Sequence, residues 1–271
     1  MARILIVAAL IAAALPGAAP AQSNVVEAAR PGEAAATADG ARLPADRTAA
    51  GFVASNLVFV FYHEVAHALI HILNLPVLGR EEDAADTLSA LLIDALWEED
   101  AAVALTYDSA LGFLLFAEEA EKSDSNLAYW GQHSLDLQRY YNLVCLFYGA
   151  NPDLRLDVAD ELDLPEERRE SCPEEFEMAA GSWGAMLEGM PPQDHGPGFR
   201  LVVPAERDAL TRIIAEEVRT LNAEYGLPVW VDVTVEPCGE ANAFYDPRAR
   251  RIVICTEYAA ELARLFAAQD R

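Results

Sequence analysis

The polar side chains of His63, Glu64 and His67, within an apolar stretch, restrict what this chain can fold into. An HExxH motif runs from His63 to His67, and Glu82 follows fifteen residues later. The apolar periodicity predicts a helix over 52–73, on which the two histidines, four residues apart, share one face. Proline and glycine in the following residues predict a turn before a second helix over 82–97. The fold must therefore set two helices side by side if Glu82 is to reach the histidines.

Two imidazoles in this arrangement can bind one zinc ion, with Glu64 beside the water on the metal. A catalytic zinc ion takes three protein ligands and leaves its fourth position open. Glu82 opens an ExxAD motif and can supply the third ligand from the second helix. Asp86, one turn further on, can accept a hydrogen bond from the outer ring nitrogen of a ligand histidine.

The motifs resemble those of zinc-dependent gluzincin peptidases, which pair HExxH with a downstream glutamate, and the ExxAD form resembles the CAAX-prenyl-protease type. The runs HEVAHALI…LPVLGREEDAAD and NAFYDP…IVICTEY resemble an uncharacterised bacterial family assigned as metallopeptidases, over about residues 50–260. The resemblance implies that His63, His67 and Glu82 are zinc ligands and that Glu64 is the general base. It implies no particular substrate.

Neighbouring residues offer alternative ligands. His71 continues the histidine series, but the helical rise places it about 6 Å beyond His67, too far to share the ion. Glu81 and Asp83 flank Glu82, which is preferred because only Glu82 has Asp86 at the ExxAD spacing. Arg80 is expected to pair with one of these carboxylates.

Peptide hydrolysis also needs a group that stabilises the oxyanion. Tyr62, His133, His195 and Tyr245 are candidates, and the sequence does not choose among them. Asn242 lies with Tyr245 on a predicted hairpin. The edge of that hairpin is expected to bind a peptide as an added strand.

The chain divides into three parts. Residues 1–21 have the features of a cleavable signal peptide, including an A-x-A site, so export to the periplasm or medium is expected. Residues 22–48 have a low-complexity composition that predicts a flexible tether. The remainder, 49–271, is the predicted metallopeptidase domain, with a helical part (49–190) that holds the zinc site and a strand–helix–hairpin part (199–271).

The formal net charge of −25 disfavours nucleic acids and anionic membrane surfaces as partners. The 52–75 segment is long enough to cross a bilayer, but Glu64 and three histidines would be costly there. No stable membrane span is therefore expected in the mature chain.

Four cysteines in an exported chain predict two disulfides. Three pairings are possible, and the local pairing is Cys145–Cys172 with Cys238–Cys255. No CxxC motif is present, which argues against a thiolate zinc site.

The predicted fold class is α+β: predominantly helical, with a small mixed or antiparallel sheet in the C-terminal part. Helices are expected at 52–73, 82–97, 100–121, 127–148, 174–187, 205–225 and 256–267, and strands at 199–203, 229–235, 241–245 and 251–255. This C-terminal set resembles the sheet behind the active-site helix of zincins, although in most zincins the sheet precedes HExxH.

The sequence thus predicts an exported zinc metallopeptidase that acts on a peptide or protein substrate. Two alternatives remain. The first is a degenerate zincin-like binding or structural module whose zinc site is not catalytic, and the second is a hydrolase of other carbonyl compounds. The intact Glu64 argues against the first, because a structural site has no use for a general base.

Overall fold

The computed structural model describes residues 48–122, 127–190, 196–205 and 207–269. The predicted signal peptide at 1–21 lies outside the described residues, as does the predicted tether except for its last residue.

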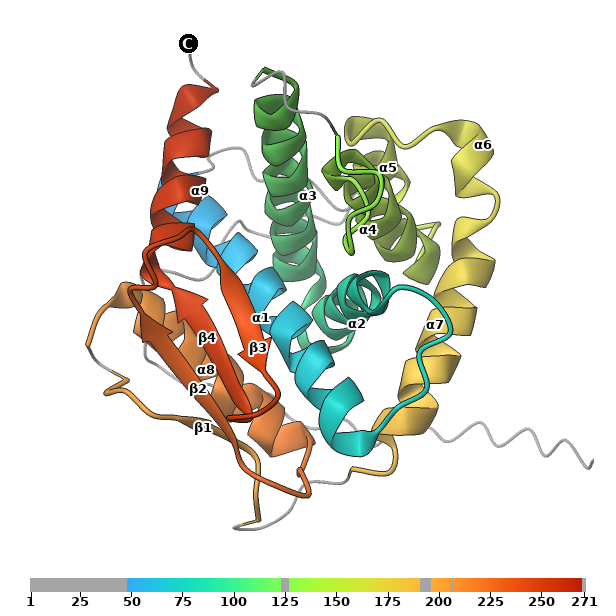
Figure 1. Ribbon diagram of the computed structural model, residues 1–271. Coiled ribbons are helices and arrows are strands. Elements are labelled where there is room, and N and C mark those ends of the chain that lie inside the picture. Colours follow the sequence, from blue (N-terminus) through green and yellow to red (C-terminus); the bar gives the residue numbers. More distant parts are fainter. Residues whose placement is uncertain (1–47, 123–126, 191–195, 206, 270–271) are drawn as a thin grey trace, which may run out of the picture.

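Helix α1 (Ala49–Leu73) carries the HExxH motif and runs through the middle of the molecule (Figure 1). The Thr48 hydroxyl accepts a hydrogen bond from the Gly51 amide, so the helix begins three residues before the predicted start. Asn74 ends it in a left-handed conformation with φ 50°. The helix is buried on nearly all sides, as expected for an apolar helix that packs against neighbours all round.

The helical part surrounds one side of α1. Helices α2 and α3 pack directly on it, and α4 packs on α2, α3 and α7. The other helices of this part, in chain order, are α2 (Glu81–Leu96), α3 (Glu99–Lys122), α4 (Asp136–Ala150), α5 (Leu156–Glu161), α6 (Glu166–Arg169) and α7 (Cys172–Leu187).

Two predicted helix starts are wrong. The helix predicted from 127 begins at Asp136, because glycine and polar residues at 131–134 favour turns over a helix. The helix predicted from 205 is α8 (Ala209–Glu224). It starts later because the Asp208 carboxylate accepts a hydrogen bond of 2.7 Å from the Thr211 amide and so caps the helix at Asp208. The segment 150–173, for which no helix was predicted, contains the short helices α5 and α6.

The C-terminal part forms a four-stranded mixed sheet with the order β1-β2-β4-β3. Strand β2 is parallel to β1 and β4, and β3 is antiparallel to β4. The strands are β1 (Phe199–Leu201), β2 (Val231–Glu236), β3 (Ala243–Asp246) and β4 (Arg251–Cys255). Helix α8 makes the crossover between β1 and β2, and α9 (Thr256–Ala268) follows β4 directly.

Helix α1 lies between the helical part and the sheet (Figure 1). It contacts β3, β4, α8 and α9 on this side, and β3 is an edge strand of the sheet. The prediction of a mainly helical chain with a small C-terminal sheet is confirmed, and the sheet is mixed. This packing sets the HExxH helix beside the edge strand β3.

Both disulfides of the local pairing are present. Cys145–Cys172 joins α4 to α7, and Cys238–Cys255 joins the segment after β2 to the end of β4. Two disulfides indicate an oxidising compartment, such as exported proteins encounter.

Helices α1 and α3 are long and apolar enough to cross a membrane when judged by length and composition alone. Buried core helices meet the same criteria, and 83% of the apolar window in α1 and 61% of that in α3 are buried within the protein.

Candidate metal centre

The two motif histidines and Glu82 converge on one point. The Nε2 atoms of His63 and His67 lie 3.1 Å apart, and Glu82 Oε2 lies 3.1 Å from the first and 3.2 Å from the second. Helix α1 supplies the histidines from one face, and the first turn of α2 supplies the carboxylate. The spacing predicted from sequence is therefore realised as a compact three-atom set.

The outer ring nitrogens fix which atoms face that point. His63 Nδ1 lies 2.8 Å from Asp86 Oδ1, and His67 Nδ1 lies 2.7 Å from Glu81 Oε1. With a proton on each Nδ1, both rings donate to a carboxylate and direct an Nε2 lone pair inward. Two nitrogen lone pairs and a carboxylate oxygen directed at one point repel each other unless a proton or a metal ion lies between them.

The three atoms have the spacing that a zinc-like ion requires. Bonds of about 2.0 Å in tetrahedral geometry place neighbouring ligand atoms about 3.3 Å apart. The observed separations of 3.1, 3.1 and 3.2 Å are close to this value. His63, His67 and Glu82 therefore fit a tetrahedral metal ion and leave one position free.

Arg139 of α4 supports the site from behind. Its guanidinium donates two hydrogen bonds to Asp86, at 2.7 and 2.8 Å, and stacks 4.3 Å from the Phe113 ring centre. Asp86 is thus fixed between Arg139 and His63. Sequence analysis placed Arg139 only within the helix predicted at 127–148, because no spacing rule connects Arg139 with a carboxylate 53 residues earlier.

His133 approaches the same carboxylate oxygen from the segment before α4. Its Nε2 lies 2.9 Å from Glu82 Oε2, and its ring stacks on that of His63 with centroids 6.0 Å apart. His63, Glu82 and His133 offer ligand atoms that all lie within 4.8 Å of one another. Sequence analysis named His133 only as an oxyanion candidate, and the structure places it among the possible metal ligands.

Asp83 and Arg80, which lie close to Glu82 in the sequence, both contact Ser134, the residue after His133. Neither belongs to the three-atom set of His63, His67 and Glu82. The Ser134 hydroxyl donates to Asp83 Oδ1 at 2.7 Å and accepts from Arg80 at 3.1 Å. Arg80 therefore reaches a carboxylate through a hydroxyl and not by the direct ion pair expected from the sequence.

The electrostatics of the site favour a charged Glu82. Burial raises the pKa of Glu82, but hydrogen bonds with His133, His63 and His67 outweigh it and hold the pKa far below its usual range. Burial lowers the pKa of His63, and hydrogen bonds with Asp86 and Glu82 reverse the effect and raise the pKa to about 9. The carboxylates of Asp86 and Glu82 therefore favour positive charge at this position.

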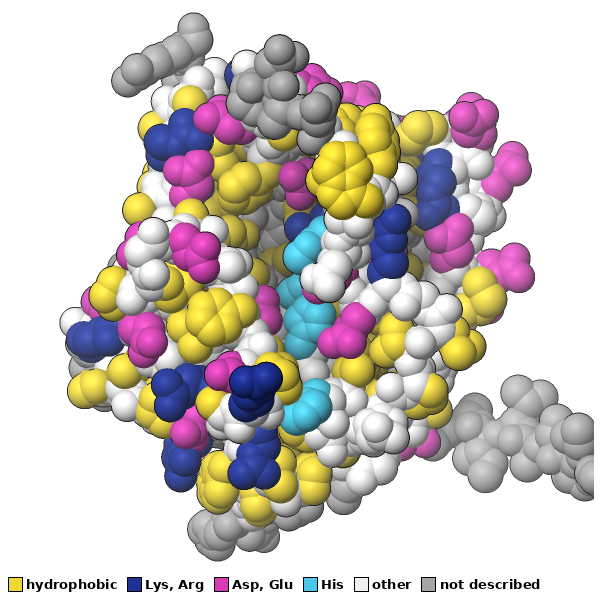
Figure 2. All heavy atoms as spheres, viewed as in Figure 1, with side chains coloured by type: hydrophobic (Ala, Val, Ile, Leu, Met, Phe, Trp, Pro, Cys, Tyr) yellow, Lys and Arg dark blue, Asp and Glu magenta, His cyan; other side chains and the backbone are white. Residues whose placement is uncertain are grey.

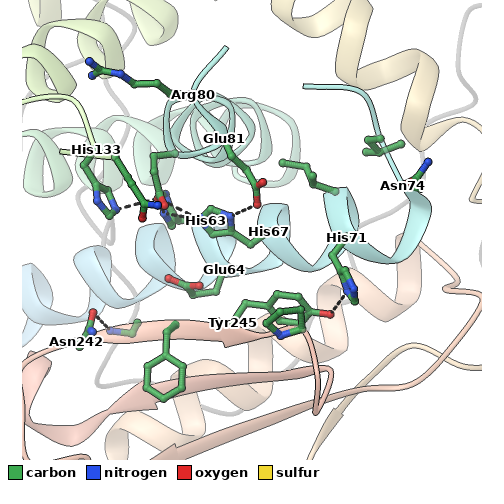
Figure 3. A pocket seen from close by; sticks show the side chains of 17 residues that line it. His63, Glu64, His67, His71, Asn74, Arg80, Glu81, His133, Asn242 and Tyr245 are labelled. Carbon is green, nitrogen blue, oxygen red and sulfur yellow. Dashed lines mark hydrogen bonds and ion pairs between the residues drawn. The ribbon is translucent and has the colours of Figure 1, made fainter. Parts of the chain in front are cut away.

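Glu64 lies next to the three-atom set but is not part of it. Its side chain is almost fully buried and faces the same cleft as His63 and His67 (Figure 3). Burial raises the pKa of the Glu64 carboxyl above its usual value. A carboxylate with a raised pKa in this position can act as a general base near neutral pH.

The donor set opens into a cleft of about 820 Å³ between α1, the start of α2 and strand β3. Figure 2 shows histidine side chains along a hollow in the surface. Asn242 and Tyr245 line the wall opposite the histidines, next to the exposed edge of the sheet (Figure 3).

The other oxyanion candidates lie in different places. Tyr245 lies in the cleft, where its hydroxyl meets His71 Nδ1 at 2.9 Å. His71 accordingly contacts Tyr245 and does not join the donor set. Tyr62 is fully buried on the far side of α1, where its hydroxyl donates to Glu217 at 2.5 Å. His195 lies outside the described residues.

Comparison with protein-family models gives a match. The family model described as "Putative metallopeptidase" (DUF4344) matches residues 31–187 and 207–271. No curated protein and no solved structure matches the chain. Since the family model covers most of the sequence, the chain belongs to this family of putative metallopeptidases.

Proposed function

We propose that the protein is an exported zinc-dependent peptidase of the gluzincin type, with a zincin-like arrangement of helix and sheet. One observation carries the proposal: two imidazoles and a carboxylate present three lone pairs to one point, beside a buried glutamate and at the base of an open cleft. The two disulfides and the predicted signal peptide support export.

In this proposal His63, His67 and Glu82 hold the metal, and Asp86 and Glu81 hold the two histidine rings in the required orientation. When bound, zinc would polarise the scissile carbonyl and lower the pKa of the attacking water. Glu64 accepts the proton of that water and passes it to the leaving amine. Because Glu64 is nearly buried, little bulk water reaches its carboxylate to compete for that proton.

The substrate is expected to bind along β3. This strand pairs with β4 on one side only, so its other edge is open to a further strand within the part of the chain that the structure describes. Asn242, Ala243 and Tyr245 line the cleft along this edge. An extended peptide that adds to β3 would pass its backbone across the metal position.

One observation favours a second candidate, a binding module with a non-catalytic metal site. His133 lies 2.9 Å from Glu82 Oε2 and shares a group of possible ligand atoms with His63 and Glu82, so a further histidine lies beside the metal position. Four protein ligands would close the metal coordination, as in structural zinc sites. The cleft and the position of Glu64 favour the peptidase, because a structural site needs neither.

The substitution Glu64→Gln tests the proposed function. The amide is nearly isosteric with the carboxylate but cannot accept the proton, so the variant is expected to bind zinc as the wild type does and to lose at least ~100-fold in hydrolysis. The zinc content of each purified protein would measure zinc binding. Cleavage of fluorescein-labelled casein, followed by mass spectrometry of a peptide mixture, would measure hydrolysis.

Glu177→Gln, an exposed change on α7, is the matched control and is expected to retain activity. Full hydrolysis by Glu64→Gln would exclude Glu64 as the base. Zinc binding without hydrolysis in the wild type and in both variants would support the binding module.

A further inference from the structure

We propose that a small pocket beside Glu64 binds a basic side chain of the substrate, so that the peptidase cuts next to lysine or arginine. The proposal rests on the proposed function and names the substrate class of the same site. Its central residue is Asp136, which lies in the first turn of α4 and outside both motifs.

The pocket branches from the cleft at the proposed general base. It has a volume of about 210 Å³, and the residues that line both the pocket and the cleft are His63, Glu64, His133, Asn242 and Ala243. Water in the liquid occupies about 30 Å³ per molecule, so the pocket has room for one amino-acid side chain and not for a longer segment. Because Glu64 lines both spaces, that side chain belongs to a residue next to the scissile bond.

The expected path of the substrate passes this pocket. Ala243 is the first residue of β3, the edge strand to which a peptide is expected to add. An added strand directs successive side chains to opposite faces. One side chain of a peptide that crosses the metal position is therefore placed to enter the pocket.

The walls of the pocket are largely aromatic. They include Phe59, Phe113, Phe116 and Tyr258. Phe59 and Phe113 are buried and meet edge to face with ring centres 5.3 Å apart, and Phe116 stacks on Tyr258 at 6.3 Å. Rings of this kind pack against the methylene stem of lysine or arginine and attract a cation at their faces.

Asp136 gives the pocket an excess of negative charge. Its side chain is one-third exposed, and its nearest cation among the described residues is Arg139, at 3.6 Å. Arg139 donates two shorter hydrogen bonds to Asp86, at 2.7 and 2.8 Å, so Asp86 balances its charge. A divalent ion at the metal position would be balanced by Glu82 and Glu64. The charge of Asp136 is then matched by one monovalent cation from the substrate.

Other classes of side chain fit the pocket less well. An acidic side chain would be repelled by Asp136 and Glu64. An apolar side chain would remove water from the Asp136 carboxylate and give no bond in return, which costs free energy. Burial already raises the pKa of the Asp136 carboxyl despite the nearby Arg139, so a further cation would stabilise its charged form.

Matched peptides test the proposal. The zinc-loaded mature chain would be incubated with a chymotryptic digest of casein, and mass spectrometry of the products is expected to show lysine or arginine at one fixed position beside the cut. In the peptide that is cleaved best, this residue would be replaced by norleucine, which keeps the apolar stem and lacks the charge. The value of kcat/KM is expected to fall at least ~10-fold, the scale of a lost hydrogen bond to a charged group.

Variants of Asp136 assign the preference to the pocket. Asp136→Asn is expected to remove the difference in kcat/KM between the basic and the norleucine peptide, and Asp136→Glu, which keeps the charge, is expected to retain most of it. Asp157→Asn, an exposed change in the first turn of α5, is the matched control and is expected to keep the wild-type difference.

A binding measurement applies if the zinc-loaded chain cleaves no peptide. Fluorescence anisotropy would compare labelled peptides of glycine, alanine and serine that carry one central lysine or one central norleucine. The lysine peptide is expected to bind at least ~10-fold more tightly to the wild type and to Asp157→Asn, and to lose this advantage in Asp136→Asn.

The outcomes separate the pocket from the proposed function. Cleavage without a basic residue beside the cut, or an equal preference in Asp136→Asn and Asp157→Asn, would overturn the role of the pocket and leave the peptidase intact. Preferential binding of the lysine peptide that depends on Asp136, without cleavage of any peptide, would overturn the proposed function and leave the pocket intact. Equal binding of both peptides without cleavage would overturn both.

Discussion

The two ligand histidines are oriented by carboxylates in different surroundings. Asp86 is nearly enclosed and is itself fixed by two hydrogen bonds from Arg139. Glu81, which orients His67, is half exposed. A hydrogen bond between buried, charged groups is screened less by solvent than one at the surface. The orientation of His63 should therefore matter more to the metal site than that of His67.

Asp86→Asn is expected to weaken zinc binding by about 10–100-fold, because the amide orients His63 less strongly and no longer forms an ion pair with Arg139. Glu81→Gln is expected to cause a smaller loss. Competition with a chromophoric chelator would measure both zinc affinities. Equal losses in the two variants would contradict the role assigned to burial.

Among the helices, α1 and α3 approach closely at Gly112. A Cβ atom at this position would lie 2.1 Å from Asn56 Oδ1 on α1. The Asn56 amide group cannot easily give way, because its nitrogen donates to the Phe52 and Asp108 carbonyls. This contact sets the distance of α3 from the helix that carries both histidines.

Gly112→Ala is expected to destabilise the protein by about 1–3 kcal/mol, because the added methyl group overpacks the contact between α1 and α3. Gly181→Ala on α7 is the control: nothing lies within 4 Å of its added Cβ, and it is expected to be neutral or stabilising by up to about 1 kcal/mol. Denaturant unfolding would measure both free energies. A Gly112→Ala variant as stable as the wild type would contradict the close packing.

The elements could be predicted where apolar periodicity is strong. Helix α1, helix α2 and the β3–β4 hairpin lie within a few residues of their predicted bounds. The start of α4 was predicted wrongly because the turn-favouring residues at 131–134 do not join the helix, and the Ser134 hydroxyl holds this segment in place by its bonds to Asp83 and Arg80. Tertiary contacts decide such boundaries.

For the molecule as a whole, the candidate site is assembled from distant segments. His63, His67 and Glu82 belong to adjacent helices, so their motif spacing was enough to predict that they meet. Arg139 and His133 come from α4 and the segment before it, more than fifty residues after the nearest motif histidine. Their approach depends on how α4 packs on α2, which the sequence alone does not specify.

The central claim is that Glu82 completes a metal site with His63 and His67, and zinc content tests it most directly. The mature chain would be loaded with zinc, desalted and measured by mass spectrometry of the metal, beside Glu82→Ala and the control Asp83→Asn. The account predicts about one zinc ion per chain in the wild type and in the control, and loss of zinc in Glu82→Ala. Zinc retained by Glu82→Ala at the level of the wild type, or absent from the wild type, would contradict it.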